Sequence, residues 1–237
     1  MTSLTDHVDE EPARMADSRA GPRPSGDTSS VAVLVGLVAV AFSAIYLFSD
    51  LLELVHGGFS TSQLVLTYAA EAAIPLFVLG LYGVQRPRIG RLGLTSAVLY
   101  AYTFVYFTGT VVYALVEGTS DWPALERRLG MWITIHSALM IVAGIGFGIA
   151  VIRARVLPWW TGATLIAGML LMVSTLSLPA AAQTASAAVR DLGFMAMGAV
   201  LLVRGGRHRR GQPHRRADAK GFADHRGPRS GLPAERL

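Results

Sequence analysis

The chain carries six long apolar runs, and they constrain its fold more than any other feature. A helix needs about 20 predominantly apolar residues to cross the hydrocarbon core of a bilayer. The runs are about Val31–Ser49, Leu64–Val84, Leu94–Val116, Met131–Ile152, Trp159–Leu178 and Ala187–Val203. None of them alternates with the two-residue period of a membrane β-strand. The sequence therefore predicts an all-α integral membrane bundle of about six transmembrane helices.

The composition agrees with a membrane protein and divides the chain into three parts. Hydrophobic residues make up 52% of the 237 residues and charged residues only 16%, whereas soluble domains are about 25% charged. Residues 1–30 are polar and rich in Pro, Gly and Ser, which predicts a disordered cytoplasmic tail. Residues 204–237 are basic and predict a second disordered cytoplasmic tail. We expect a six-helix transmembrane domain over residues 31–203.

Arginines between the apolar runs indicate the orientation. They follow the second, fourth and sixth runs, as Arg86, Arg88, Arg91, Arg153, Arg155 and the basic tail from Arg204. Cytoplasmic loops carry an excess of Lys and Arg, so the sequence predicts a multi-pass protein of the cell membrane with both termini cytoplasmic. The net charge of +5 comes largely from the C-terminal tail. Because no folded nucleic-acid reader accompanies this tail, we expect contact with membrane lipid rather than with nucleic acid.

The absence of cysteine and the near absence of lysine exclude several kinds of chemistry. The chain has no cysteine, so disulfides, thiolate nucleophiles and cysteine-held metals or haem are excluded. Lys220 in the tail is the only lysine, so no intramembrane residue is available for a Schiff base. No motif indicates a cofactor, and we expect none.

Glu71 is the most informative single residue, because it lies inside the apolar run Leu64–Val84. A carboxylate within a membrane costs roughly 2.5–3.5 kcal/mol on insertion scales and usually faces a cavity or a partner. Pro75 follows four residues later, and its ring clashes with the carbonyl of residue 71. We expect a kink near Glu71 and a role for this acid beyond packing.

Most ionisable residues within or near the runs fall in the outer half of the predicted bundle. They are Asp50, Glu53, His56, Glu71, Glu117, His136, Arg190 and Asp191, the last two in the first turns of the sixth run. Four tyrosines lie at comparable depths, namely Tyr46, Tyr68, Tyr106 and Tyr113. This one-sided distribution predicts an outward-opening pocket with apolar and aromatic walls and a polar bottom, which suits a lipophilic small molecule.

Each of these residues also has a purely structural interpretation. Acids at helix ends are commonly solvated, and Arg190 and Asp191 could pair with each other or across helices. His136 could hydrogen-bond a neighbouring helix, and the tyrosines could serve packing. Glu71 is the hardest of these residues to explain in this way.

Two of the acids suit proton chemistry on an apolar substrate. Burial disfavours the charged form of a carboxyl group, so Glu71 could carry a proton and donate it. Asp191, kept ionised by Arg190 or another donor, could stabilise a developing cation or accept a proton. Glu71 and Asp191 are therefore candidate catalytic residues. His136, Arg190 and the four tyrosines are candidates for shaping the substrate pocket, since aromatic faces also stabilise carbocations.

With Glu71 in an early run and Asp191 in the last, the chain resembles the small polytopic terpene cyclases of meroterpenoid and indole-terpenoid pathways. The resemblance covers size, apolar character and these two positions, and the family is usually drawn with seven helices whereas the chain has six runs. It implies acid-initiated cyclisation of a prenyl or isoprenoid substrate. The second half, from VLPWWTGATLIAGMLLM onward, also resembles uncharacterised six-helix membrane proteins of high-GC bacteria.

Three other functions stay open from the sequence. A metal site could use Asp50, Glu53 and His56, with Glu117 or His136 completing the ligands, although one straight helix presents the first three over a broad face. A proton-coupled carrier of a lipophilic compound would need polar residues on both sides of the midplane. A non-enzymatic scaffold subunit would need each of its charges paired.

Overall fold

The computed structural model describes the backbone of residues 27–224 and the side chains of residues 30–206. The helices are α1 Asp27–His56, α2 Thr61–Val84, α3 Gly90–Glu117, α4 Trp122–Leu129, α5 Met131–Ala154, α6 Trp159–Ser174 and α7 Ala180–Asp224. Residues 27–224 contain no strand, so the predicted all-α class is confirmed. The N-terminal tail predicted over residues 1–30 lies almost entirely outside the described residues.

Five of these helices are long and apolar enough to cross a membrane: α1 from Ser30, α2, α3, α5, and α7 as far as Gly206. The remaining apolar helix, α6, has 16 residues and is about 24 Å long, against about 30 Å for the hydrocarbon core. The predicted fifth run extends to Leu178, but α6 ends at Ser174 and a short turn precedes Pro179. The residue before a proline is disfavoured in the helical region, which accounts for this earlier end.

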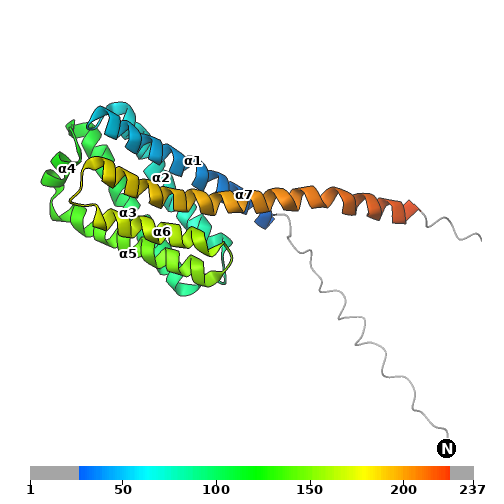
Figure 1. The fold of residues 1–237 in the computed structure, drawn as a ribbon. Helices are drawn as coiled ribbons and strands as arrows, with labels where there is room; N and C mark the ends of the chain where they lie inside the picture. The colour runs from blue at the N-terminus through cyan, green and yellow to red at the C-terminus, as the bar shows by residue number, and fades with distance from the viewer. Residues whose placement is uncertain (1–26, 225–237) are drawn as a thin grey trace, which may run out of the picture.

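The six apolar helices, α1, α2, α3, α5, α6 and α7, lie side by side in one bundle (Figure 1). Their contacts close into a ring around a shared core. In chain order, α1 packs on α2, α2 on α3, α3 on α5, α5 on α6 and α6 on α7, and α7 returns to pack on α1. The approach of α1 to α7 is close at Gly36 and Gly198, since a Cβ atom on either glycine would meet the other's carbonyl oxygen at 2.7 Å. Small residues of this kind allow helices to pack closely within a membrane.

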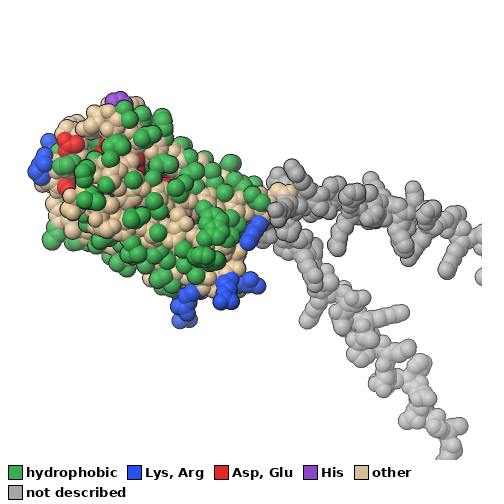
Figure 2. Space-filling view, viewed as in Figure 1, with side chains coloured by type: hydrophobic (Ala, Val, Ile, Leu, Met, Phe, Trp, Pro, Cys, Tyr) green, Lys and Arg blue, Asp and Glu red, His purple; other side chains and the backbone are tan. Residues whose placement is uncertain are grey.

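The flank of the bundle is apolar, as expected for contact with lipid tails. Large hydrophobic side chains stay exposed on every long helix, among them Leu34, Leu76, Val105, Val142, Leu170 and Leu192. On the face shown in Figure 2, hydrophobic side chains cover the flank, and arginines lie at its ends. This surface, together with the five long helices, fits a multi-pass membrane protein.

The segment between the third and fourth predicted runs contains a short helix, α4, that the apolar pattern does not predict. Asp121 caps it, since the Asp121 carboxylate accepts a hydrogen bond of 2.8 Å from the backbone N–H of Ala124. The hydroxyl of Ser120 donates a second bond of 2.8 Å to the same carboxylate. The helix N–H and the hydroxyl hold the pKa of Asp121 below its ordinary value.

The last helix differs from the prediction at both ends. It begins at Ala180, whereas the sixth run was expected to begin at about Ala187 after an outer loop. The segment AAAQTASAA is rich in alanine, the strongest helix former, and it follows Pro179. Arg190 and Asp191 consequently lie in the middle of a transmembrane helix and not in its first turns. The helical backbone then continues to Asp224, over residues for which a disordered tail was expected.

Candidate functional site

Five side chains from three helices form a polar group inside the apolar bundle, which we call the Glu71 cluster. They are Tyr46 and Asp50 on α1, Glu71 on α2, and Arg190 and Asp191 on α7. Tyr46, Glu71 and Arg190 each lie about 15 Å along their helix from the end nearest the α1–α2 loop. The three helices thus bring their polar residues to one depth, close to the middle of the bundle.

Glu71 is buried and only partly satisfied. Its side chain is 4% exposed, and its Oε1 accepts a hydrogen bond of 2.9 Å from the hydroxyl of Tyr46. Its Oε2 is also buried and has no hydrogen-bond partner among the described residues. An unpaired buried charge is costly, so this environment suits a carboxyl group that carries its proton on Oε2. The helix continues through Pro75, whose missing N–H leaves the carbonyl of residue 71 without its usual partner.

Arg190 and Asp191 form a buried ion pair. The Arg190 Nε lies 2.8 Å from the Asp191 Oδ1, and its Nη2 donates a second bond of 3.2 Å to Oδ2. Both residues are at most 3% exposed. The guanidinium carbon of Arg190 also lies 4.8 Å from the centre of the Tyr46 ring, a cation–π distance. Tyr46 therefore contacts Glu71 through its hydroxyl and Arg190 through its ring.

The charges of the Glu71 cluster do not balance if all its acids are ionised. Asp50 lies one helical turn after Tyr46 and on the same face of α1, so three carboxyl groups lie near one guanidinium. Buried ionisable groups are paired or neutralised. Asp191 has its partner in Arg190, whereas Glu71 is buried without a cation of its own and suits the neutral form. The cluster thus contains carboxyl groups in two unlike environments, as acid–base chemistry requires.

Aromatic rings form one wall of the Glu71 cluster. Ring centres lie 6.4 Å apart for Tyr46 and Phe104, 5.0 Å for Tyr100 and Phe104, and 5.5 Å for Tyr100 and Phe194. The hydroxyl of Tyr100 is buried and has no hydrogen-bond partner among the described residues. Tyr100 and these phenylalanines do not stand out in the sequence, because aromatic residues inside apolar runs carry no signal of which way they face.

The other predicted pocket residues lie away from this group. His136 on α5 stacks on Tyr106 of α3, with ring centres 3.6 Å apart and planes inclined by 9°. Its Nδ1 lies 2.8 Å from the carbonyl oxygen of Trp132 and therefore donates, which leaves Nε2 to accept from the hydroxyl of Tyr102 at 3.3 Å. These contacts join α3 to α5. Tyr68 is 44% exposed, and Tyr113 packs on a smaller core at the α4 end.

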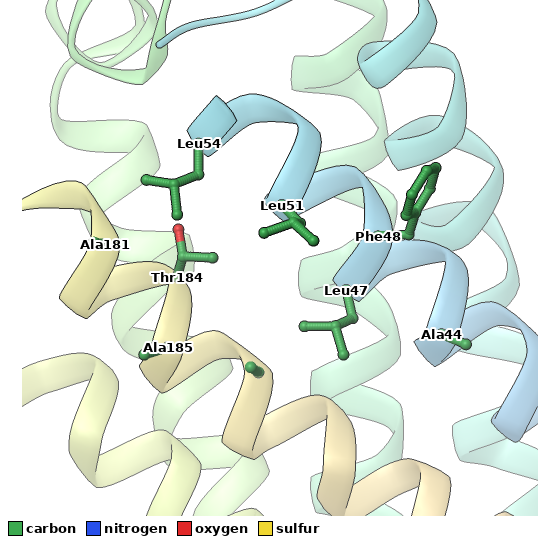
Figure 3. Close-up of a pocket in the computed structure, with 9 residues that line it drawn as sticks. Ala44, Leu47, Phe48, Leu51, Leu54, Ala181, Thr184 and Ala185 are labelled. Atoms are coloured by element: carbon green, nitrogen blue, oxygen red, sulfur yellow. The ribbon is translucent and has the colours of Figure 1, made fainter. Parts of the chain in front are cut away.

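A groove of about 460 Å³ lies between α1 and α7 on the outside of the bundle (Figure 3). It is lined by Ala44, Leu47, Phe48, Leu51, Leu54, Ala181, Thr184, Ala185 and Ala188. Its walls are apolar apart from Thr184, so it lacks the polar bottom that the sequence predicted. Leu47 and Leu51 follow Tyr46 and Asp50 directly on α1, so the groove lies on the helix face next to the Glu71 cluster.

The sequence left open a metal site at the end of α1. The arrangement of the side chains there does not favour such a site. Over residues 30–206, no three or more His, Asp or Glu side chains are grouped as metal ligands. The Nδ1 of His56 lies 2.7 Å from the carbonyl oxygen of Leu52 in its own helix. Glu53 instead accepts a hydrogen bond of 3.4 Å from the Gln63 side chain.

Comparison of the chain with protein-family models, with curated proteins and with solved structures gave no match.

Proposed function

We propose that the chain is a membrane-embedded terpene cyclase that starts the cyclisation of a prenyl or isoprenoid substrate by proton donation from Glu71. The hydrogen bond from Tyr46 to Oε1 of Glu71, with Oε2 buried and unpartnered, is the observation that supports this most directly. This hydrogen bond orients the Glu71 carboxyl group and leaves Oε2 free to carry a transferable proton.

The two acids have different roles in this proposal. The O–H bond of Glu71 breaks as its proton forms a C–H bond with an alkene carbon, or an O–H bond with an epoxide oxygen. Asp191, paired with Arg190, stays ionised and stabilises the carbocation that results. The cyclised cation then loses a proton to the Asp191 carboxylate and forms an alkene. Asp191 releases that proton and Glu71 takes up another, so the protons balance over one turnover. The ring of Tyr46 already accepts one cation, Arg190, and the neighbouring aromatic wall offers further π faces.

The substrate would enter from the membrane. The groove between α1 and α7 is open to the lipid side, is almost wholly apolar and has the volume of a small-molecule site. An isoprenoid chain in this groove would lie one helix face away from Tyr46 and Asp50. Access from this groove to Glu71 requires α1 and α7 to separate locally, because the two helices pack directly on each other.

The same proposal includes the location and orientation of the protein. The exposed arginines Arg86, Arg88, Arg153 and Arg155 lie at the end of the bundle opposite the α1–α2 loop. Positive residues of this kind mark the cytoplasmic side. With α6 as a sixth crossing, both termini would be cytoplasmic and the Glu71 cluster would be reached from the outer side of the cell membrane.

The test is conversion of a substrate by the full chain in membranes. Prenylated and epoxidised prenyl compounds are supplied to the wild type, to Glu71→Gln and to Glu117→Gln. Glu117→Gln makes the same chemical change at an exposed acid paired with Arg128. We expect isomeric cyclised products, detected by mass spectrometry, from the wild type and Glu117→Gln, and none from folded Glu71→Gln. No conversion by the wild type would overturn the proposal.

A second candidate function is a proton-coupled carrier of a lipophilic compound. It is favoured by a row of hydrogen-bonded polar side chains that leads from Glu53 toward Glu71. A carrier would accumulate the compound unchanged under a pH gradient, and Glu71→Gln would stop this uptake. Chemically unaltered compound inside the vesicles thus separates the carrier from the cyclase. A scaffold is favoured less, because Oε2 of Glu71 is unpaired.

A further inference from the structure

The described charges are divided unequally between the two ends of the bundle. Exposed arginines occupy the end opposite the α1–α2 loop, which we call the arginine end: Arg86, Arg88, Arg91, Arg153, Arg155 and Arg204. Every acid whose side chain the structure describes lies in the middle of the bundle or at the other end: Asp50, Glu53, Glu71, Glu117, Asp121, Glu126 and Asp191. On the face shown in Figure 2, acidic side chains appear only toward the end that carries α4.

No acid neutralises the arginine end within residues 30–206. The ion pairs in this part of the chain join Arg128 to Glu117 and Arg190 to Asp191, and neither pair includes an arginine of this end. Like charges that gather on one surface repel each other and create a positive potential that attracts anions. The arginine end therefore offers its charges to an anion from outside the described residues.

Three of these arginines meet at one turn of the chain, which we call the arginine corner. Arg153 lies in the last turn of α5, and Arg155 follows this helix as its C-cap. Arg204 of α7 reaches the same turn, because its Nη1 donates a hydrogen bond to the carbonyl oxygen of Val156. A guanidinium has five N–H donors, so this single bond leaves most of the Arg204 donors available. The corner thus gathers three positive charges from α5, α7 and the turn that leads to α6.

Two exposed tryptophans place the arginine corner at the level of the lipid headgroups. Trp159 and Trp160 are the first residues of α6, directly after this turn, and are 68% and 45% exposed. Tryptophan is enriched where the membrane meets water, because its ring has an apolar body and a polar N–H. Further along the same helix, Leu170 and Leu171 are also exposed, as expected for contact with lipid tails. The corner therefore lies beside the membrane surface and not in open water.

We infer that the arginine corner binds the phosphate of an anionic phospholipid, with Trp159 and Trp160 packing on the glycerol and upper acyl chains of the same lipid. The planar guanidinium group matches the geometry of a phosphate and donates two hydrogen bonds to it. Basic pockets between transmembrane helices recognise anionic headgroups in this way. The adjacent indole rings favour a lipid over a soluble anion. This site lies at the opposite end of the bundle from the α1–α2 loop and does not depend on the proposed cyclisation.

The tryptophans allow the site to be tested by fluorescence of the full chain. The chain has four tryptophans, and Trp122→Phe with Trp132→Phe leaves Trp159 and Trp160 as the only two. This two-tryptophan chain is placed in mixed vesicles of phosphatidylcholine and phosphatidylglycerol, in which one of the two lipids carries bromine on its acyl chains. Bromine quenches indole fluorescence on contact. Quenching as a function of lipid composition therefore gives the relative affinity of the two lipids beside α6.

Four variants of the two-tryptophan chain separate a site from a general charge effect. Arg153→Gln and Arg155→Gln each remove one charge from the arginine corner. Arg88→Gln removes one from the α2–α3 turn at the same end, and Arg127→Gln removes an exposed charge at the end that carries α4. An arginine beside an anionic lipid contributes about fivefold in affinity. We expect the two-tryptophan chain to prefer phosphatidylglycerol by at least that factor, and each corner variant to lower the preference by about that factor. Arg88→Gln and Arg127→Gln should leave it unchanged.

Three results would overturn the inference. Equal affinity of the two-tryptophan chain for both lipids would mean that the corner does not select an anionic headgroup. A fall in Arg88→Gln as large as in Arg155→Gln would show a general positive field and no site. Displacement of phosphatidylglycerol by sodium phosphate, but not by sodium chloride at equal ionic strength, would assign the corner to free phosphate. Thermal unfolding in detergent checks that each variant is folded, and Arg153→Gln decides the matter if Arg155→Gln is not.

Discussion

Tyr46 contacts both Glu71 and Arg190, and so links α2 to α7 within the Glu71 cluster. Its hydroxyl donates to Glu71 at 2.9 Å, and its ring lies under the Arg190 guanidinium at 4.8 Å. A change at either partner is therefore transmitted to the other through one rigid aromatic ring. Among the described residues, no other side chain contacts both Glu71 and Arg190 by a hydrogen bond or a cation–π contact.

Removal of the Tyr46 hydroxyl isolates this link. Tyr46→Phe keeps the ring and its contacts with Arg190 and Phe104 but leaves Oε1 of Glu71 buried without a partner. We expect a loss of about 1–3 kcal/mol in the free energy of unfolding and a strong loss of substrate conversion. Thermal unfolding in detergent and product analysis measure the two effects. Tyr68→Phe, the same change at an exposed tyrosine of α2, should alter neither, and equal behaviour of the two variants would contradict the role of Tyr46.

The ion pair between Arg190 and Asp191 makes a second prediction possible. Asp191→Asn leaves the Arg190 charge buried without a counter-ion, which should cost about 3–5 kcal/mol. The double variant Arg190→Met, Asp191→Leu removes both charges at similar volume and should recover most of that loss. Denaturant unfolding in micelles compares the three proteins. Neither variant should convert substrate, so a double variant that is stable and still active would refute the role of Asp191.

The sequence allowed some of these residues to be recognised and not others. Glu71 and Asp191 stand out because a carboxyl group inside an apolar run is rare and costly. The choice of Tyr46 over Tyr68, Tyr106 and Tyr113 depends on which face each helix turns inward, and the weak polar periodicity of these helices does not determine that. A partial signal did exist for the polar face of α2, because Gln63, Thr67 and Glu71 recur at the four-residue spacing of one helix face.

The crossing of α6 and α7 fixes the position of Arg190 within the bundle. Gly168 on α6 faces the backbone of Arg190, and a Cβ atom there would collide with the Arg190 backbone nitrogen and Cα. The absence of a side chain at this position allows α7 to approach α6 closely enough to bury the Arg190–Asp191 pair. The short helix α6 therefore contributes to the site by a close approach and not by a functional group.

Gly168→Ala tests this contribution. The added methyl group must push α7 away, because backbone atoms cannot yield as a flexible side chain can. We expect a destabilisation of about 1–3 kcal/mol, typical of overpacking, and a weakened Arg190–Asp191 pair. Gly109→Ala is the control, since nothing lies within 4 Å of a Cβ atom there, and it should stabilise α3 by up to about 1 kcal/mol. Thermal unfolding measures both, and a neutral Gly168→Ala would show that α7 can shift freely.

The cap of α4 gives a pH-dependent prediction outside the membrane-spanning segments. The pKa of Asp121 is held below its ordinary value by the N–H of Ala124 and the hydroxyl of Ser120. Ionised Asp121 therefore stabilises the folded form above the unfolded pKa of about 3.9, and this contribution disappears as pH falls through the lower folded pKa. Hydrogen exchange of α4 amides should be faster in Asp121→Ala than in the wild type at pH 6. The ratio of the two rates should approach one in strong acid, and a constant ratio would contradict the cap.

Element boundaries were predicted less well than the elements themselves. Every predicted run overlaps an apolar helix, because length and hydropathy report on burial in lipid, although the helix of the fifth run, α6, has only 16 residues. Hydropathy does not predict α4, because this helix is polar. Its start is set by the cap at Asp121 and by Pro123 in its first turn. Hydropathy also missed the start of α7, where small residues between Ala180 and Ala187 form a helix with little apolar character. Capping residues and alanine content indicate where these helices begin. The hydropathy pattern alone does not.

The number of crossings decides on which side of the membrane the two ends of the chain lie. Five helices have full spanning length, and an odd number of crossings would put the ends on opposite sides. In the bundle, however, Ala181 at the start of α7 lies across the groove from Leu54 at the end of α1. Because α7 begins at the α1–α2 loop end, α6 must traverse the bundle despite its 16 residues. A short crossing helix is accommodated by local thinning of the bilayer.

The cysteine-free chain allows this arrangement to be measured directly. Single cysteines replace Ser120 before α4, Ser177 between α6 and α7, and Arg88 between α2 and α3, all of them exposed. With six crossings and the arginine-bearing end in the cytoplasm, a membrane-impermeant maleimide should label Ser120→Cys and Ser177→Cys in intact cells. It should label Arg88→Cys only after permeabilisation, and the parent chain should stay unlabelled. Labelling of Ser120→Cys without Ser177→Cys would mean that α6 does not cross the membrane. The reverse pattern at all three sites would mean that the orientation is inverted.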